Sequence, residues 1–151
     1  MSRLTLLLLV VVLVLTACGG SAPREFQRYT SQDAINAFVA AGLEAESPTP
    51  IDPNEETLLP KTFVEGQRFL ITSLGEDRGG RVFSFENEKE LNAIKDYYEA
   101  FSGLFGSWVF VEANLVVQIG NDLPKAKAEQ YERALAALDD RQSSPWQWVF
   151  V

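Results

Sequence analysis

The sequence has 151 residues with 23% charged and 46% hydrophobic side chains, and its formal net charge at pH 7 is −8. It contains no histidine and one cysteine, Cys18, which excludes an intrachain disulfide, Ser-His-Asp and Cys-His catalysis, and histidine metal ligands. A chain of this length is expected to form one domain, and its acidic balance argues against nucleic-acid binding.

The first 17 residues have the organisation of an export signal. Arg3 precedes an apolar run of 12 residues, Leu4–Leu15, interrupted by a single threonine, and the small residues Thr16 and Ala17 follow it. A helix that crosses a bilayer needs about 20 apolar residues. A secretory signal needs only about 7–15, with a basic residue before them and small residues at the cleavage site. We therefore predict a signal peptide at residues 1–17.

The four residues Leu15-Thr16-Ala17-Cys18 resemble the lipobox of bacterial lipoproteins at every position. The resemblance implies that Cys18 is acylated and becomes the first residue of the mature chain. Two or more acyl chains hold a protein stably on a membrane, whereas one gives only marginal binding. Membrane lipid is therefore an expected partner through Cys18. The alternatives are an ordinary signal peptide that contains a cysteine, and a short N-terminal anchor.

Residues 18–29 are predicted to form a flexible tether, because Gly19-Gly20-Ser21-Ala22-Pro23 combines coil-forming Gly and Ser with a proline. A single domain is then expected over residues 30–151. The protein is expected to be exported and anchored by lipid to the outer face of the cell membrane, or to the outer membrane in a cell that has two.

A first helix is predicted from Thr30 to Leu43. Thr30 or Ser31 can cap it, and Asp33 lies in the first turn, where a carboxylate favours the positive helix end. Gly42 is expected to end it. Apolar residues recur on one face at helical spacing: Ile35, Phe38, Val39 and Leu43.

Residues 44–60 contain four prolines and are predicted to be mainly an irregular connection, with a short strand around Leu43–Glu46 as an option. The acidic cluster in this segment comprises Asp52, Asn54, Glu55 and Glu56. Such oxygen ligands suit calcium, but the EF-hand spacing with its central glycine is missing. A solvated acidic loop is therefore favoured over a metal site.

The segments Thr62–Leu74 and Arg81–Glu86 alternate in the manner of strands, and the glycine-rich residues 75–80 between them are typical of a hairpin turn. A phosphate loop is not favoured, because glycines of that kind open a helix and here a strand follows. Charged residues at the turn form a candidate recognition surface: Glu76, Asp77, Arg78 and Arg81.

A second helix is predicted after Asn87, which is a good N-cap and has Glu90 at the capping-box position. Gly103 and Gly106 are expected to end this helix. Its apolar residues recur at helical spacing, which is more typical of a core than of a ligand platform: Leu91, Ile94, Tyr98, Phe101 and Phe105.

The segments Trp108–Val111 and Leu115–Ile119 are predicted to form a second hairpin that turns at residues 112–114. Because Trp108–Val111 is apolar on both faces, it is expected to be an interior strand. A third helix is predicted from about Asp122 or Leu123 to residues 139–141, with Pro124 in its first turn. Its expected buried face is Ala128, Tyr131, Leu135 and Leu138.

The C-terminal segment Trp146–Val151 alternates after Pro145, and two interpretations stay open. The alternation favours a final edge strand that packs Trp146, Trp148 and Phe150 inward. Alternatively, the tryptophans could contact the bilayer interface, where this residue type is common.

The order of these elements predicts an α+β fold. Strands joined by short turns pair antiparallel. We expect a two-layer sandwich of an antiparallel sheet of about four to six strands, including two hairpins, with three helices, preceded by a signal peptide helix.

Several stretches together resemble a family of small bacterial lipoproteins of uncharacterised function, some of which are labelled stress proteins. The stretches are Ala41–Glu44, Ser73–Asn87, Tyr97-Tyr98, Ser107–Phe110 and Asn114–Ile119. The resemblance extends from about Thr30 to Leu138. It implies lipid anchoring and a small domain, and it supplies no catalytic residues.

These features favour a non-enzymatic, lipid-anchored interaction or accessory protein of the cell envelope, with an envelope protein as partner, no cofactor and no nucleic acid. The alternative is a small-ligand binder with Trp108, Tyr97 and Tyr98 around a pocket. A hydrolase that uses paired carboxylates is less favoured, because two acids must be held at a fixed separation in a cleft. The candidate pairs are Glu86 with Glu88 and Glu55 with Glu56.

Overall fold

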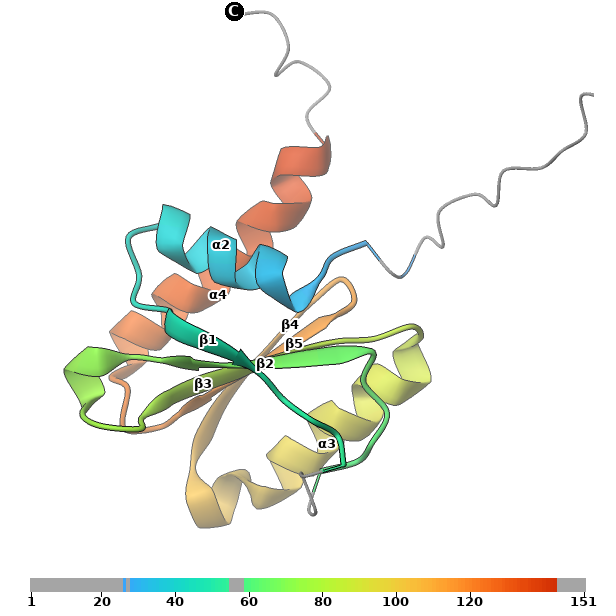
Figure 1. The fold of residues 1–151 in the computed structure, drawn as a ribbon, viewed down its shortest axis with the longest axis horizontal. Coiled ribbons are helices and arrows are strands. Elements are labelled where there is room, and N and C mark those ends of the chain that lie inside the picture. Colours follow the sequence, from blue (N-terminus) through green and yellow to red (C-terminus); the bar gives the residue numbers. More distant parts are fainter. Residues whose placement is uncertain (1–25, 27, 55–58, 144–151) are drawn as a thin grey trace, which may run out of the picture.

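The computed structural model describes residues 26, 28–54 and 59–143 (Figure 1). The predicted signal peptide, Cys18, most of the predicted tether and the segment Trp146–Val151 lie outside the described residues. The helices are α2 (Ser31–Ala40), α3 (Glu88–Phe105) and α4 (Lys125–Ser143), with a short 3-10 helix η1 (Thr72–Leu74). The strands are β1 (Glu46–Pro50), β2 (Glu65–Leu70), β3 (Gly79–Ser84), β4 (Ser107–Glu112) and β5 (Leu115–Gly120). Among the described residues, no helix combines the length and apolar character needed to cross a bilayer.

The five strands form one sheet in the order β1-β2-β3-β5-β4, and every neighbouring pair is antiparallel. The predicted hairpins β2–β3 and β4–β5 are confirmed. The α+β class, the three helices and the antiparallel sheet are confirmed as well. β3 lies at the centre, and α3 connects it to β4, so that the chain returns through β5 to pair with β3.

The layering differs from the expected two-layer sandwich, because helices cover both faces of the sheet (Figure 1). α2 and α4 lie on one face, and α3 lies on the other. The two faces have separate cores: Val82 and Val117 belong to the cluster with α2 and α4, whereas Phe83 and Val116 belong to the cluster with α3. Since successive strand residues point to opposite faces, the central strands are apolar on both sides and each side requires a helix.

The prediction that Trp108–Val111 is an interior strand is wrong, because β4 is an edge strand. Its apolar residues are explained by the helices instead. Trp108 and Phe110 pack against the core on the α4 side, and Val109 packs against the core on the α3 side. An edge strand between two helical layers therefore has the same apolar pattern as an interior one.

The opposite edge of the sheet is β1, which follows the optional strand position at Leu43–Glu46. All five of its residues are exposed, and it contains Pro48 and Pro50. Ser47 has a positive φ of 47°, and the pairing register with β2 shifts between Glu46 and Thr49. Prolines and a bulge are common features of edge strands, because they hinder pairing with another chain.

The predicted helix caps are present. The Thr30 side chain accepts a hydrogen bond from the Asp33 amide, and the Asp33 carboxylate accepts one from the Thr30 amide, which completes a capping box. Asn87 Oδ1 accepts from the Glu90 amide at 3.1 Å. Gly42 (φ +72°) follows α2 and Gly106 (φ +51°) follows α3, as expected of glycine at helix ends.

Three details of the helices differ from prediction. Val39 is 58% exposed and does not belong to the core face of α2. Gly103 lies inside α3, and Gly106 ends that helix. α4 continues to Ser143 beyond the predicted end at residues 139–141. Its predicted buried residues Ala128, Tyr131 and Leu135 are buried, and Leu138 is partly buried against the same core.

Candidate functional site

The register of the β2–β3 hairpin decides which side chains meet on the sheet. Phe69 pairs with Gly80, and Gly66 pairs with Phe83. An ideal Cβ at position 80 would lie 2.5 Å from Phe69 Cζ, so only glycine leaves room for the phenylalanine ring. The pairing therefore extends β3 back to Gly79, and the residues expected to form the end of the turn belong to the strand.

This register places Arg68 directly opposite Arg81, and Arg81 in turn pairs with Gln118 on β5. The three side chains form a row across the three middle strands on the α3 face of the sheet. They border a cavity of about 170 Å³, whose lining residues are Arg68, Asp77, Gly79, Gly80, Arg81 and Gln118. We call this cavity the arginine pocket.

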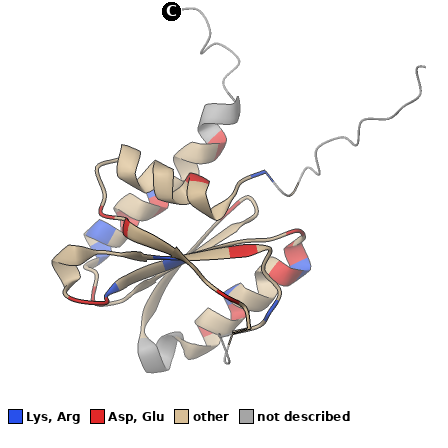
Figure 2. Cartoon of the chain, viewed as in Figure 1, with Lys and Arg blue, Asp and Glu red and all other residues tan. Residues whose placement is uncertain are grey.

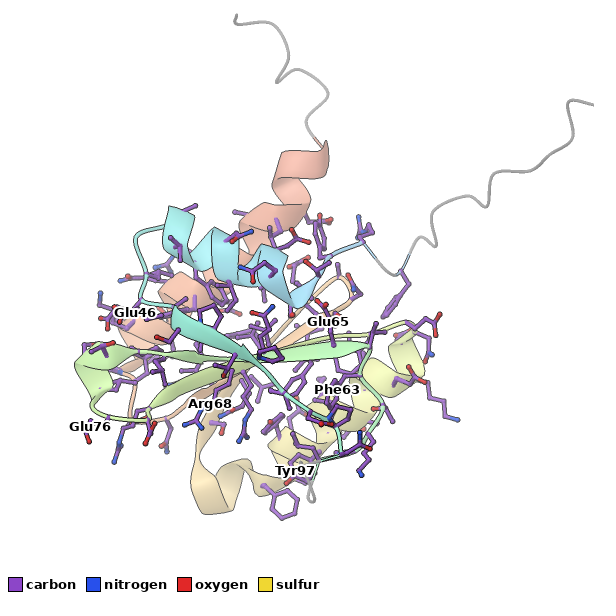
Figure 3. All side chains as sticks on the ribbon, viewed as in Figure 1. Glu46, Phe63, Glu65, Arg68, Glu76 and Tyr97 are labelled. Atoms are coloured by element: carbon purple, nitrogen blue, oxygen red, sulfur yellow. The ribbon has the colours of Figure 1, made fainter. Side chains whose placement is uncertain are left out.

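The arginine pocket brings together two of the four predicted recognition residues, Asp77 and Arg81. The other two lie apart from it, in the exposed loop that Figure 3 marks with Glu76. Arg78 Nη1 makes an ion pair with Asp122 Oδ2 at 2.5 Å. Arg81 is half-buried in β3, where its Nη1 lies 3.4 Å from Tyr98 Oη.

Two residues of the pocket, Arg68 and Gln118, were missed by sequence analysis. Arg68 is exposed on β2 (Figure 3), and its Nη2 donates to the Asp77 carbonyl at 2.5 Å. Gln118 Nε2 donates to Ser107 Oγ at 3.0 Å. One sequence feature could have indicated this pair: a phenylalanine packs well opposite a glycine. Pairing Phe69 with Gly80 sets the register of the hairpin, and the adjacent pair in that register is Arg68 with Arg81.

The arginine pair is a local concentration of positive charge in an acidic protein. Figure 2 shows charged residues of both signs spread over helices, strands and loops, with basic positions on β2 and β3. Like charges directly opposite each other in a sheet are destabilising. A guanidinium group carries its positive charge at physiological pH. Arg68 and Arg81 therefore bring two positive charges together in a pocket whose lining also includes Asp77.

A second cavity, of about 350 Å³, lies between the end of α2, η1 and the start of α4. Glu44 accepts a hydrogen bond from the Ser73 amide at 2.7 Å, and this bond holds the pKa of Glu44 below its usual range. Tyr131 Oη donates to the Glu44 carbonyl at 2.7 Å, and burial raises the pKa of Tyr131 to about 12. These polar groups in the wall of the cavity are bonded to one another.

The three aromatic residues proposed to surround a ligand do not share a pocket. Trp108 contacts the core on the α4 side, and its indole Nε1 donates to the Leu123 carbonyl at 2.9 Å. Tyr98 and Tyr97 belong to the core on the α3 side, with their ring centroids 5.4 Å apart in an edge-to-face arrangement. The sheet separates Trp108 from the two tyrosines.

The acidic candidates lie at the surface. Asp52 Oδ1 accepts from the Asn54 amide at 2.7 Å, a local turn contact, and Glu55 and Glu56 lie outside the described residues. Glu86 and Glu88 are exposed at the start of α3. Within residues 26, 28–54 and 59–143, no group of three or more Cys, Asp or Glu side chains is arranged to hold a metal ion.

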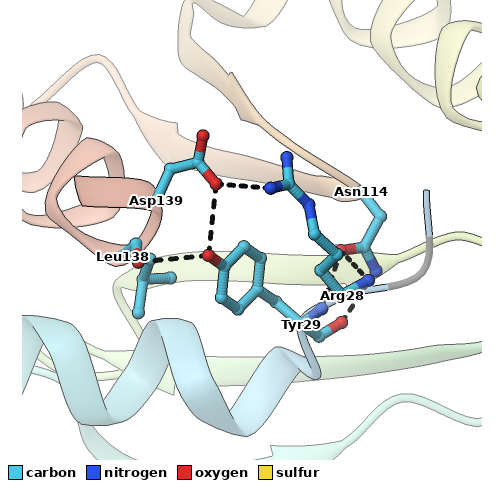
Figure 4. A network of polar contacts seen from close by, with 5 residues as sticks. All are labelled: Arg28, Tyr29, Asn114, Leu138 and Asp139. Atoms are coloured by element: carbon cyan, nitrogen blue, oxygen red, sulfur yellow. Dashed lines mark hydrogen bonds and ion pairs between the residues drawn. The ribbon is translucent and has the colours of Figure 1, made fainter. Parts of the chain in front are cut away.

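A buried polar network fixes the chain where it enters the domain (Figure 4). Asn114 is fully buried in the β4–β5 turn, and its Oδ1 accepts from the amides of Arg28 (3.1 Å) and Tyr29 (2.9 Å). Its Nδ2 donates to the Tyr29 carbonyl at 2.7 Å. We call these contacts the N-terminal clasp.

The clasp also reaches the last turns of α4. Tyr29 Oη donates to the Leu138 carbonyl (3.1 Å) and to Asp139 Oδ1 (3.3 Å), and Arg28 Nη1 lies 2.8 Å from Asp139 Oδ1 (Figure 4). Burial, followed by the charge of Asp139, raises the pKa of Tyr29. Residues 28 and 29, expected to belong to the tether, are therefore bound to the folded domain.

Comparisons with protein-family models, with curated proteins and with solved structures gave no match. The resemblance to small bacterial lipoproteins stays a prediction from the sequence.

Proposed function

We propose that this protein is an exported, lipid-anchored interaction or accessory protein of the cell envelope, without catalytic activity of its own. The lipobox at Leu15–Cys18 supports the anchor, and the resemblance to small bacterial lipoproteins supports the same class. In this proposal acylated Cys18 holds the protein on the outer face of the membrane, and the folded domain meets its partner.

The N-terminal clasp is the observation that carries this proposal. It holds Arg28 and Tyr29 beside the β4–β5 turn, so the tether enters at one end of the strands. Ser84 pairs with Leu115 at that end, whereas Gly80 pairs with Ile119 toward the other end. The loop of residues 71–78 and the arginine pocket therefore lie toward the end of the sheet away from the tether, where they are accessible to a partner.

The length of the tether is compatible with this role. The 11 residues from Cys18 to Arg28 extend to at most about 40 Å, at about 3.3–3.6 Å per residue. That reach is comparable with the full thickness of a bilayer of about 40–45 Å including the headgroups. The domain can thus act some distance above the membrane surface while Cys18 stays anchored.

Metabolic labelling with a palmitate analogue tests the anchor. The wild-type protein should incorporate the label and sediment with membranes, and Cys18→Ala should do neither. Ser21→Ala, a change of similar size in the same segment, serves as the control and should be labelled like the wild type. Equal labelling of wild type and Cys18→Ala contradicts the proposal.

Crosslinking in intact membranes tests the interaction role. Residues on the loop of residues 75–78 are the preferred positions for a photoreactive side chain, because that loop is exposed and lies away from the tether. An envelope protein should be crosslinked at these positions and not from exposed positions of α4. Identical crosslinks from both positions contradict a specific partner surface at the loop.

Binding of a small ligand is a second candidate function, and the arginine pocket is the observation that favours it. The aromatic pocket expected for such a function is not formed by Trp108, Tyr97 and Tyr98. A polar pocket with two guanidinium groups takes its place.

A further inference from the structure

We propose that the arginine pocket binds the phosphate group of a small soluble molecule between the guanidinium groups of Arg68 and Arg81. This inference rests on the second function proposed above, ligand binding, and is independent of the lipid anchor. It assigns to Arg68 and Arg81 the role of binding residues.

The register of the hairpin places both arginines at one pocket. Side chains directly opposite each other in an antiparallel pair have Cβ atoms about 4.5–5.5 Å apart, and Arg68 and Arg81 are such a pair. Guanidinium groups bind phosphate oxygens through two parallel N–H bonds each. A phosphate group has enough oxygens to make such a pair of bonds with each guanidinium, whereas a monocarboxylate has two oxygens and can make one such pair.

Glycine keeps the pocket open beside Arg81. Residues 79 and 81 lie on the same face of β3 because strand residues alternate, so a side chain at position 79 would stand next to the guanidinium. An ideal Cβ at position 79 would collide with the Phe69 carbonyl, which disfavours any other residue there. The cavity of about 170 Å³ is several times the share of liquid volume of one water, about 30 Å³.

The site differs from a phosphate loop, which the sequence argues against. No helix N-terminus is used, and the positive charge comes from side chains on adjacent strands. Asp77 also lines the pocket, and its negative charge opposes an anion. Removal of that charge should therefore tighten phosphate binding, which is a response that a purely structural pair of arginines does not predict.

The position of the pocket favours a soluble ligand over the headgroups of the anchoring membrane. The N-terminal clasp lies beside Leu115, at one end of β5, and Gln118 lies toward the other end. Arg68 is exposed, so a ligand from solution has direct access to it.

Isothermal titration calorimetry of the full-length protein in a non-ionic detergent, with inorganic phosphate as the probe, tests the proposal. Saturable binding is expected, with a dissociation constant on the order of 1 mM, and it should weaken as salt is added because the contacts are ionic. Arg68→Gln and Arg81→Gln should each weaken binding about tenfold or more, as loss of a charged hydrogen-bond donor implies. Acetate should bind more weakly than phosphate.

Two further variants sharpen the test. Arg133→Gln removes an exposed arginine from α4 and makes the same change in net charge, so its affinity for phosphate should equal that of the wild type. Asp77→Asn should bind phosphate more tightly. Arg81 is half-buried, so Arg81→Gln could fail to fold. In that case the phosphate affinity of Arg68→Gln decides the test, because Arg68 is exposed.

The proposal is overturned if phosphate gives no saturable binding, or if Arg68→Gln binds it like the wild type. Two other results would contradict the proposal and assign a different ligand to the pocket. Binding of vesicles that contain phosphatidic acid in an Arg68-dependent manner, without binding of free phosphate, assigns the pocket to a lipid headgroup. Binding of a polyglutamate peptide under the same condition assigns it to an acidic protein partner. Cys18→Ala should bind phosphate normally, so a failure of the anchor and a failure of the pocket are distinguishable.

Discussion

Asn114→Ala should destabilise the domain strongly, because Asn114 joins the entering chain to the β4–β5 turn through buried hydrogen bonds. Its side chain is fully buried and makes three hydrogen bonds to the main chain of Arg28 and Tyr29. The substitution removes all three bonds at once. The amide and carbonyl of Tyr29, which is buried, are then left without this partner, whereas the Arg28 amide keeps its hydrogen bond to the Phe26 carbonyl at 3.0 Å.

The size of the effect follows from the bonds that are lost. Each hydrogen bond contributes about 0.5–1.5 kcal/mol net, and a buried group left without a partner costs about 1–3 kcal/mol. Three bonds, of which the one from the Arg28 amide is only partly buried, give an expected loss of about 2–4 kcal/mol in the free energy of unfolding. The thermal midpoint should fall by roughly 10 °C or more.

Urea unfolding followed by circular dichroism measures this loss. Asn36→Ala is the matched control, because Asn36 is exposed on α2 and bonds only to the Gln32 side chain in the described structure. Arg28→Gln is a second comparison: its ion pair with Asp139 is 41% exposed on both sides, so it should contribute less than about 1 kcal/mol. A loss for Asn114→Ala no larger than that of Arg28→Gln refutes the reasoning.

Three further predictions concern the core, a buried hydroxyl and a cap. Gly80→Ala should lower the free energy of unfolding by about 1–3 kcal/mol through overpacking against Phe69, and Phe69→Leu in the same chain should recover part of the loss in a double-mutant cycle. Burial raises the pKa of Tyr131 from 10.0 to about 12. The protonated hydroxyl of Tyr131 therefore stabilises the folded state below pH 10, and this stabilisation is lost as the pH rises from about 10 to 12. Wild-type stability should therefore fall in that window, and Tyr131→Phe, which also loses the bond to the Glu44 carbonyl, should show a smaller fall. Thr30→Ala should cost about 1 kcal/mol through loss of the helix cap, measured by thermal unfolding.

The features predicted well from the sequence are those that depend on neighbouring residues. The capping box at Thr30 and Asp33 and the N-cap at Asn87 involve contacts three residues apart. Gly42 and Gly106 end helices through their own backbone conformation. Such contacts are decided by a few adjacent residues, and the surrounding fold changes them little.

The layering of the fold was harder to predict because it depends on which faces remain uncovered. The apolar residues on both faces of the strands were visible in the sequence, but two arrangements explain them. A strand can be apolar on both sides because it is interior, as β3 is, or because helices cover both faces of the sheet, as at β4. The pattern of Trp108–Val111 alone does not distinguish these cases.

The N-terminal clasp depends on contacts that no local pattern reveals. Asn114 binds residues 85 and 86 positions earlier in the chain. From the sequence it is a turn residue, since asparagine is common in turns for its own local hydrogen bonds. Arg28 and Tyr29 belong to the segment predicted to be a tether, and nothing in their immediate neighbours in the sequence marks the start of the folded domain.

The register of the β2–β3 hairpin determines both the packing of Phe69 in the core and the position of the arginine pocket. The Phe69 ring and the Gln118 carbonyl leave no room for a Cβ at position 80, and the register that pairs Phe69 with Gly80 also pairs Arg68 with Arg81. A shift of the register by one residue would turn every side chain of β2 to the other face and would bury Arg68 in the core with α2 and α4. The packing of Phe69 therefore enforces the opposition of two like charges. The proposed phosphate would lie between these two side chains, on the accessible face that the same register creates.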